Sequence, residues 1–158
     1  MRFFRLAAVC LAVSAPAILA ADRPVRFEEL AKVRRVGGFS ASPDGRMVAY
    51  SVSTPDVEAN TSRSAIWVAP ASGGEAQRMT SGEKRDSDPR YSPDGRRLAF
   101  LSNRDGSSQI WVMDLAGGDP VKATAFPTEV NGFSWSPDGE ICRYAPMSRH
   151  PASKPKCR

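Results

Sequence analysis

The chain has little of the chemistry from which catalytic and metal sites are built. Its 158 residues include one histidine, His150, and three cysteines. A single histidine near the C-terminus can complete neither a Ser-His-Asp triad nor a histidine-based metal site. The nearest approach to a Gly-x-Ser-x-Gly nucleophile elbow is 38–42, which fails because its last residue is serine. We therefore predict no catalytic, cofactor-binding or metal-ligating residue, and no cofactor.

An excess of one charge is also lacking once the two ends of the chain are set aside. The formal net charge is +5, yet residues 22–140 carry 15 basic and 17 acidic side chains. The excess lies in 1–21 and in 141–158. A slightly negative folded part offers no electrostatic surface for a phosphate backbone. We therefore predict that nucleic acid is not a partner.

A long apolar run occurs at the N-terminus. Arg2 and Arg5 precede the apolar stretch Leu6–Leu19, and Ala20 and Ala21 follow it. This is the pattern of a secretory signal peptide, and the run is too short for a spanning helix with stop-transfer flanks. We predict a signal peptide that ends at residue 20 or 21, export to a bacterial periplasm, and no membrane partner after cleavage.

The next segment, 22–38, is expected to be a lead-in helix. Within Arg26–Val36, Phe27 and Leu30 fall on one helical face, and Gly37-Gly38 is a natural helix stop. We expect this helix to pack on the structure that follows it.

The most informative pattern is a repeat. Ser-Pro-Asp-Gly occurs at 42–45, 92–95 and 136–139, and Ile-Trp-Val occurs at 66–68 and 110–112. The two Ile-Trp-Val triplets lie 44 residues apart. A fixed period of this length with strand-like content is typical of a β-propeller blade. The fold class predicted is all-β, a partial β-propeller of two blades and the start of a third.

Each part of the repeat has a physical reason. Pro93 presets φ for a tight turn, the Asp94 side chain can accept from nearby backbone N–H groups, and Gly95 can take a positive φ. After this turn, Leu98–Leu101 is apolar without alternation. Such a strand is expected to be buried on both faces, as it would be between two neighbouring blades.

The repeat also sets the expected domain limits. We place the partial propeller at 39–140, with blades at about 39–80 and 88–124 and a third from about 132. The first blade has six extra residues around 55–61, which we assign to a hairpin tip because loop length costs little entropy.

The C-terminal tail departs from the repeat. After Gly139 an apolar strand is expected, but 141–158 is basic and contains three prolines. We expect this tail to be disordered or translated out of frame after Glu140, or to be a natural unstructured tail. Cys142 and Cys157 would be free to form a disulfide in an exported protein.

These residues resemble a known family. The segment 30–36 leading into 40–52, the run 92–106 and the run 132–139 are similar to exported prolyl oligopeptidase-family serine peptidases, which include acylaminoacyl peptidases and dipeptidyl aminopeptidases. The resemblance covers about residues 24–140 and implies a propeller of about seven blades over an α/β-hydrolase domain. In that family the propeller restricts access to the nucleophile. The blades also resemble TolB-like periplasmic propellers.

Three functions stay open at this point. The first is the substrate-gating propeller portion of an exported serine peptidase, not catalytic without the hydrolase domain, which would be its partner together with peptides. The second is a portion of a TolB-like propeller that binds envelope proteins. The third is an independent interaction module that assembles its blades between several copies.

Overall fold

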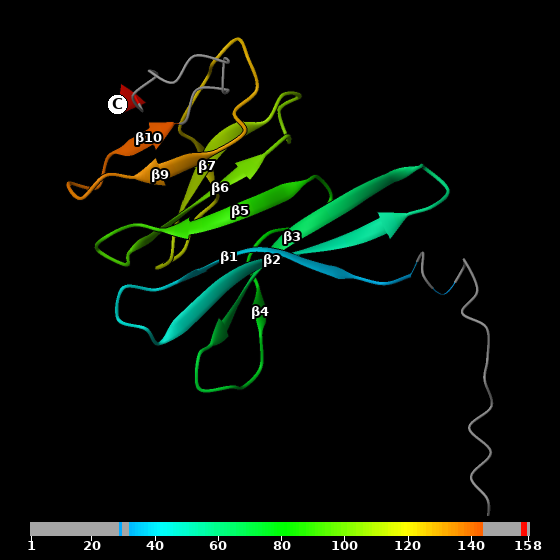
Figure 1. The fold of residues 1–158 in the computed structure, drawn as a ribbon, viewed down its shortest axis with the longest axis horizontal. Coiled ribbons are helices and arrows are strands. Elements are labelled where there is room, and N and C mark those ends of the chain that lie inside the picture. Colours follow the sequence, from blue (N-terminus) through cyan, green and yellow to red (C-terminus); the bar gives the residue numbers. More distant parts are fainter. Residues whose placement is uncertain (1–28, 30–31, 144–155, 158) are drawn as a thin grey trace, which may run out of the picture.

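The computed structural model describes residues 29, 32–143 and 156–157. Within them, the strands form three antiparallel sheets that lie side by side (Figure 1). In each of the first two sheets the strand order follows the chain order, so each is a simple up-and-down meander. This confirms an all-β partial propeller with two four-stranded blades, followed by a smaller third sheet.

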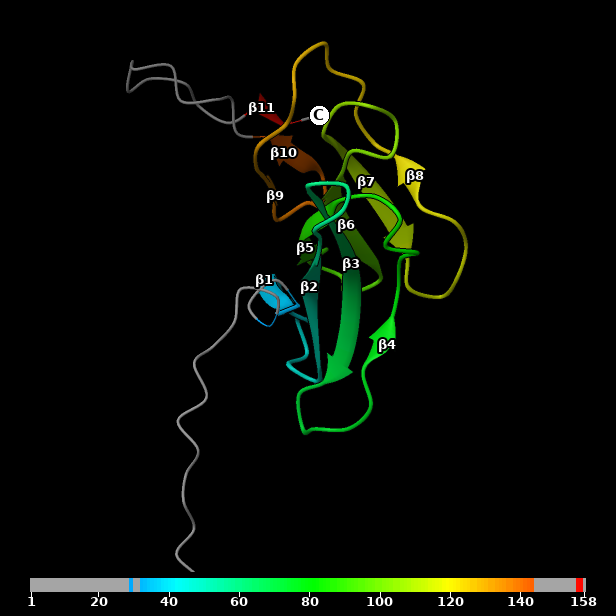
Figure 2. The same ribbon diagram turned by 90° about the vertical axis from the view of Figure 1, so that its right-hand side faces the viewer.

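The first blade consists of β1 (Arg35–Ala41), β2 (Met47–Asp56), β3 (Thr61–Pro70) and β4 (Gln77–Arg78). The second consists of β5 (Asp86–Tyr91), β6 (Arg97–Ser102), β7 (Gln109–Asp114) and β8 (Val121–Lys122). The third sheet consists of β9 (Phe133–Trp135), β10 (Ile141–Arg143) and β11 (Lys156–Cys157). The first strands of the three sheets are neighbours, because β5 contacts both β1 and β9. The outermost strands β4 and β8 lie on the opposite side of the stack (Figure 2).

The Ser-Pro-Asp-Gly turns form as the sequence predicts. In the second copy, Gly95 has φ of 70° and the Arg96 N–H donates to Asp94 Oδ1 at 3.1 Å. The serine has a role that the sequence analysis missed. Ser92 Oγ accepts from the Arg97 N–H at 2.9 Å, which ties the start of β6 back to the turn. The first copy repeats this arrangement, with a glycine φ of 70° and the Met47 N–H as the donor. In the third copy the glycine φ is 83°, and Ser136 Oγ accepts from the Glu140 N–H, the residue directly after the glycine.

Strand β6 is buried on both faces, as its unbroken apolar sequence predicts. Leu98 and Phe100 pack towards the first blade, in a cluster that includes Ile66. Ala99 and Leu101 pack towards the third sheet. All four residues are at most 7% exposed. The middle blade is therefore held by two separate apolar interfaces, one for each neighbour.

The residue three positions before each Ser-Pro-Asp-Gly turn shows by its exposure whether that face of the sheet is covered by a neighbouring sheet. Phe133 occupies this position in the third sheet and is fully buried against the second blade. Phe39 occupies it in the first blade and is 78% exposed. Among the described residues, the first blade therefore has a covered face towards β5 and an open face on its other side.

The prediction of a lead-in helix is wrong at the C-terminal end of that helix. Arg35 and Val36 belong to β1 rather than to a helix, because they pair with Ser53 and Val52 of β2. The glycine pair 37–38 lies at a bulge of this strand rather than at a helix stop. Its role is close approach: a Cβ on Gly38 would lie 3.3 Å from the Cα of Asp88. Most of the remaining predicted helix and the whole predicted signal peptide lie outside the described residues.

The expectation of a disordered tail from residue 141 is also wrong at its start. Ile141–Arg143 forms β10 and pairs with β9, and Lys156–Cys157 pairs with β10 in turn. The register places Cys142 opposite Cys157 along the backbone. The side chains of both cysteines lie outside the described part, so the disulfide stays a prediction, as does the out-of-frame origin. Residues 144–155, which include His150, also lie outside it.

Candidate functional site

The two ends of the blades differ in what they carry. One end holds the Ser-Pro-Asp-Gly turns, and we call it the turn end. The other holds the β2–β3 hairpin tip, the β6–β7 turn and the links that run from one blade to the next, and we call it the connection end. Links and insertions gather at the connection end, which makes it the expected place for a binding surface.

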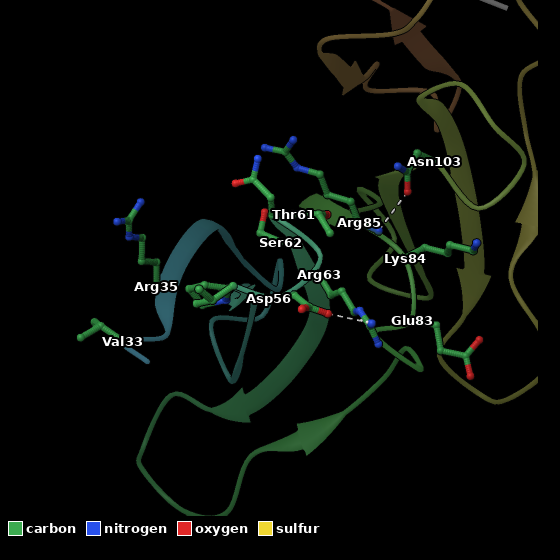
Figure 3. A pocket seen from close by; sticks show the side chains of 13 residues that line it. Val33, Arg35, Asp56, Thr61, Ser62, Arg63, Glu83, Lys84, Arg85 and Asn103 are labelled. Atoms are coloured by element: carbon green, nitrogen blue, oxygen red, sulfur yellow. Dashed lines mark hydrogen bonds and ion pairs between the residues drawn. The ribbon is translucent and has the colours of Figure 1, made fainter. Parts of the chain in front are cut away.

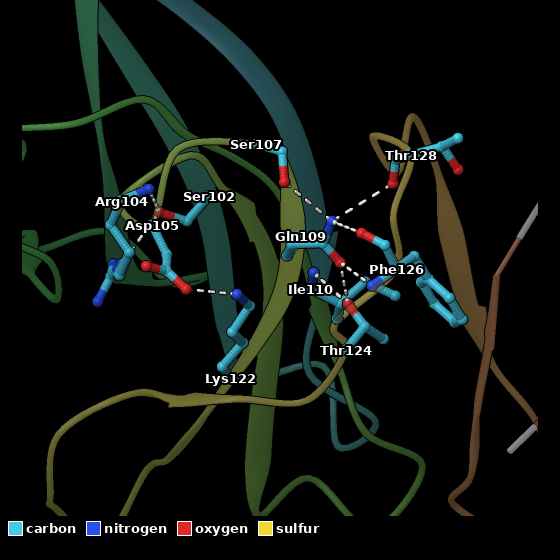
Figure 4. A network of polar contacts seen from close by, with 10 residues as sticks. All are labelled: Ser102, Arg104, Asp105, Ser107, Gln109, Ile110, Lys122, Thr124, Phe126 and Thr128. Atoms are coloured by element: carbon cyan, nitrogen blue, oxygen red, sulfur yellow. Dashed lines mark hydrogen bonds and ion pairs between the residues drawn. The ribbon is translucent and has the colours of Figure 1, made fainter.

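A buried glutamine fixes the link from the second blade to the third sheet (Figure 4). Gln109 is 1% exposed, and its Nε2 donates to the carbonyl oxygens of Phe126 and Thr128 at 3.1 and 3.3 Å. Its Oε1 accepts from Thr124 Oγ1 at 3.0 Å and from the Phe126 N–H at 3.1 Å. The amide thus holds the link through backbone groups and the Thr124 hydroxyl, so we assign it a structural role.

The link from the first blade to the second is held by other groups. Ser64 donates through its N–H to the Lys84 carbonyl at 3.1 Å and through Oγ to the Asp86 carbonyl at 2.6 Å. From the second blade, Asn103 Oδ1 accepts from the Arg85 N–H at 2.9 Å. The backbone that carries Lys84 and Arg85 is therefore fixed from both sides.

Asp86, at the start of β5, corrects an expectation. The sequence favours a solvated loop at Asp86 and Asp88, with a cation site as the alternative. Instead Asp86 is 1% exposed and pairs with Arg104, whose Nη2 lies 3.2 Å from both carboxylate oxygens. Asp88 pairs with Arg90 at 3.1 Å. Both carboxylates are paired with arginines, Asp86 with Arg104 of the β6–β7 turn and Asp88 with Arg90 of β5.

The connection end is hollowed beside this link (Figure 3). The extra residues of the first blade lengthen the β2–β3 hairpin, whose tip turns at Asn60 with φ of 46°. An open pocket of about 1070 Å³ lies between this hairpin, the start of β1 and the 83–85 link. The lining residues come from these segments and from the β6–β7 turn: Val33, Arg35, Pro55, Asp56, Val57, Asn60, Thr61, Ser62, Arg63, Glu83, Lys84, Arg85 and Asn103.

The charges in this pocket are unequal. Arg63 is paired with Asp56, their Nη2 and Oδ2 atoms lying 2.8 Å apart. The side chains of Arg35, Lys84 and Arg85 are exposed and form no ion pair within the described part of the chain. The pocket therefore presents unneutralised positive charge. Sequence reasoning missed it because its cations come from separate segments, and only the six extra hairpin residues pointed to it.

The shifted pKa values lie at the turn end, away from this pocket. Hydrogen bonds from the serine hydroxyl, and then from a backbone N–H, lower the pKa of Asp44, Asp94 and Asp138 below the usual 3.8. Burial, and to a smaller degree the charge of Asp44, raise the pKa of Tyr91 above its usual value. Serine-bonded carboxylates of this kind stabilise turns and are not aligned with any base, so we assign them no catalytic part.

Two further properties concern the described residues alone. They contain no group of three or more histidine, cysteine, aspartate or glutamate side chains arranged to hold a metal ion. Among them, no helix has the length and apolar character needed to cross a lipid bilayer.

Comparison with known proteins gives peptidases and a TolB propeller as similar proteins. The chain is 33% identical over 117 residues to a dipeptidyl-peptidase 5 of Porphyromonas endodontalis, covering 74% of this chain and 17% of that protein. The fold is similar to that of the Pyrococcus horikoshii acylaminoacyl peptidase, with a TM-score of 0.60, 23% identity and coverage of 72% of this chain and 17% of the other. A TolB structure from Agrobacterium tumefaciens has a TM-score of 0.56 at 27% identity, covering 70% of this chain and 38% of that one.

A family profile described as the tricorn protease N-terminal beta propeller domain matches residues 54–157. The match includes both Ile-Trp-Val triplets and continues into the tail beyond β10. With the stacked four-stranded sheets described above, it shows that the chain belongs to the family of the tricorn protease N-terminal β-propeller domain.

Proposed function

We propose that these blades are the substrate-gating propeller portion of an exported serine peptidase and carry no catalytic residue themselves. In this proposal the propeller covers an α/β-hydrolase domain and lets peptides, but not folded proteins, reach the nucleophile. The predicted signal peptide at 1–20 or 1–21 would direct the protein to the periplasm or outside the cell.

The observation that carries the proposal is the match to a dipeptidyl-peptidase 5 along 74% of the chain. The chain spans 17% of that relative's length, so the activity of the whole relative enters only as a proposal. The packing of β6 between two neighbouring sheets, which we call wedge packing, supports the proposal physically. A blade whose central strand is buried on both sides is suited to a ring of blades, and a ring forms the wall of a channel.

A second function has an observation in its favour. The TolB structure is similar in fold, and the chain covers a larger share of it, 38%, than of the peptidases. A TolB-like propeller that binds envelope proteins is therefore the alternative. It needs no hydrolase domain, and this difference makes the two functions separable.

The test is to read the coding DNA on both sides of codon 140, in all three frames, and to express the longest continuous product. The peptidase proposal expects further blades followed by a Gly-x-Ser-x-Gly elbow, and labelling of that serine by a fluorophosphonate probe. Further blades that end without an elbow would support the TolB-like alternative. Hydrolysis of a dipeptidyl or acylaminoacyl substrate by the 158-residue chain alone would refute the non-catalytic assignment.

A further inference from the structure

We propose that the connection-end pocket, which Arg35 and Arg85 line, binds a carboxylate group of a peptide. This inference rests on the proposed gating function, because it identifies which peptides the propeller retains at its entrance. It concerns the pocket of about 1070 Å³ between the β2–β3 hairpin, the start of β1 and the 83–85 link.

The first argument is charge. The lining includes four basic and two acidic residues, and one of the acids, Asp56, is already paired with Arg63. Residues 22–140 as a whole carry more acidic than basic side chains. The excess of positive charge in the pocket is thus local and opposite in sign to the rest of the folded part. A site of this kind raises the concentration of anions at its surface.

The second argument is the type of cation. Arginine presents a planar fork of donors that matches a carboxylate, and it stays charged at every physiological pH. Arg35 and Arg85 make no ion pair with any described residue. In Figure 3 both side chains extend away from the Asp56–Arg63 pair. Their donors are therefore available to a ligand.

The third argument is that the anchor is fixed before a ligand arrives. The Arg85 N–H is held by Asn103 Oδ1 at 2.9 Å, and the backbone of Arg85 bridges to Ser64 of β3. Arg35 starts the paired part of β1, opposite Ser53. Two rigid backbones leave only the arginine side chains to be ordered on binding, which lowers the entropic cost.

The fourth argument identifies the ligand as a peptide rather than a small anion. Thr61 and Ser62 line the same pocket, and their hydroxyl groups have no hydrogen-bond partner in the described part of the chain. Hydroxyl groups can both donate to and accept from a peptide backbone. The volume is at the upper end of that of small-molecule pockets and has room for several peptide residues. The pocket also lies beside the first strand of each blade, because Arg35 begins β1 and the 83–85 link runs into β5.

The carboxylate has two sources, an acidic side chain or the C-terminus of the peptide, and three synthetic pentapeptides separate them. The first has an internal glutamate with both ends blocked, the second has no acidic side chain but a free C-terminus, and the third has neither. Isothermal titration calorimetry of the purified full chain measures each affinity at low salt. We expect the first or the second peptide to bind at least about tenfold more tightly than the third, with a difference that shrinks as salt screens the charges.

Matched variants test the residues. Arg85→Gln should weaken the carboxylate-dependent binding by about tenfold, the usual size for one charge-assisted hydrogen bond. Arg96→Gln makes the same change of charge at an exposed position of the turn end and should leave the affinity unchanged. Far-ultraviolet circular dichroism shows that wild type and variants hold the same amount of sheet before binding is compared.

Two results would overturn the inference: equal binding of all three peptides, or equal loss in Arg85→Gln and Arg96→Gln. Neither result touches the gating proposal, which is decided by the coding sequence for a nucleophile elbow. Conversely, a coding sequence that contains no nucleophile elbow would refute the peptidase proposal, while the peptide titrations would still decide whether the pocket binds a carboxylate.

Discussion

Replacement of Phe100 by alanine is the sharpest test of the wedge packing. Phe100 is fully buried in the interface between the two blades, beside Ile66 and Val68 of β3. The loss combines the transfer free energy of the ring with a cavity that the neighbouring strands cannot fill. Such a change lowers the free energy of unfolding by about 3–5 kcal/mol. The matched control is Phe39→Ala, because Phe39 is 78% exposed and should cost about 0.5 kcal/mol or less.

The assay is urea unfolding followed by tryptophan fluorescence and circular dichroism. With a denaturant dependence of about 2 kcal/mol per molar urea, Phe100→Ala should lower the midpoint by about 2 M. The Phe39→Ala midpoint should stay within about 0.3 M of wild type. Equal midpoints for the two variants would mean that the interface between β3 and β6 is not formed in solution, and the wedge description would fail.

Three further predictions concern other contacts. Acid should destabilise the chain, because hydrogen bonds from Ser92 and then from the Arg96 N–H lower the pKa of Asp94. The stabilisation from Asp94 is full above the usual pKa of 3.8 and is lost as the pH falls through the lowered pKa. A urea midpoint at about pH 3 that is no lower than the midpoint at about pH 6 would contradict this. Gly38→Val should cost about 1–3 kcal/mol, because the new Cβ would lie 3.3 Å from the Asp88 Cα; a loss below about 0.5 kcal/mol in urea unfolding would count against this contact. Asp86→Ala should cost about 3 kcal/mol, since it leaves Arg104 unpaired, and a change below about 1 kcal/mol in chemical unfolding would refute the importance of this pair.

The sequence predicted the parts of the fold that repeat. The run Leu98–Leu101 lacks alternation, so burial on both faces followed from the pattern alone, and the Ser-Pro-Asp-Gly turns followed from proline and glycine. The serine escaped notice because its Oγ accepts from a residue beyond the turn, and such a bond depends on where the next strand begins.

The errors arose where one pattern fits two structures. The pair Gly37-Gly38 follows an amphipathic stretch, so it reads as a helix stop, whereas its real role is close contact with Asp88. Asp86 reads as solvated because its partner Arg104 is distant in the sequence. The pocket was not predicted for the same reason: Arg35 and Arg85 come to line one pocket only after the blades have stacked.

The two-sided burial of β6 has a consequence for how stability accumulates. The four apolar residues of β6 belong to two interfaces. The second blade therefore behaves like an interior repeat of a linear array, in which each repeat is stabilised by its nearest neighbours. Each blade added to such an array contributes one new interface, while the two end blades each keep one uncovered face. The cooperativity of unfolding should therefore rise with every added blade. The exposed face of the first blade, which bears Phe39, should remain the place where unfolding starts until another element covers it.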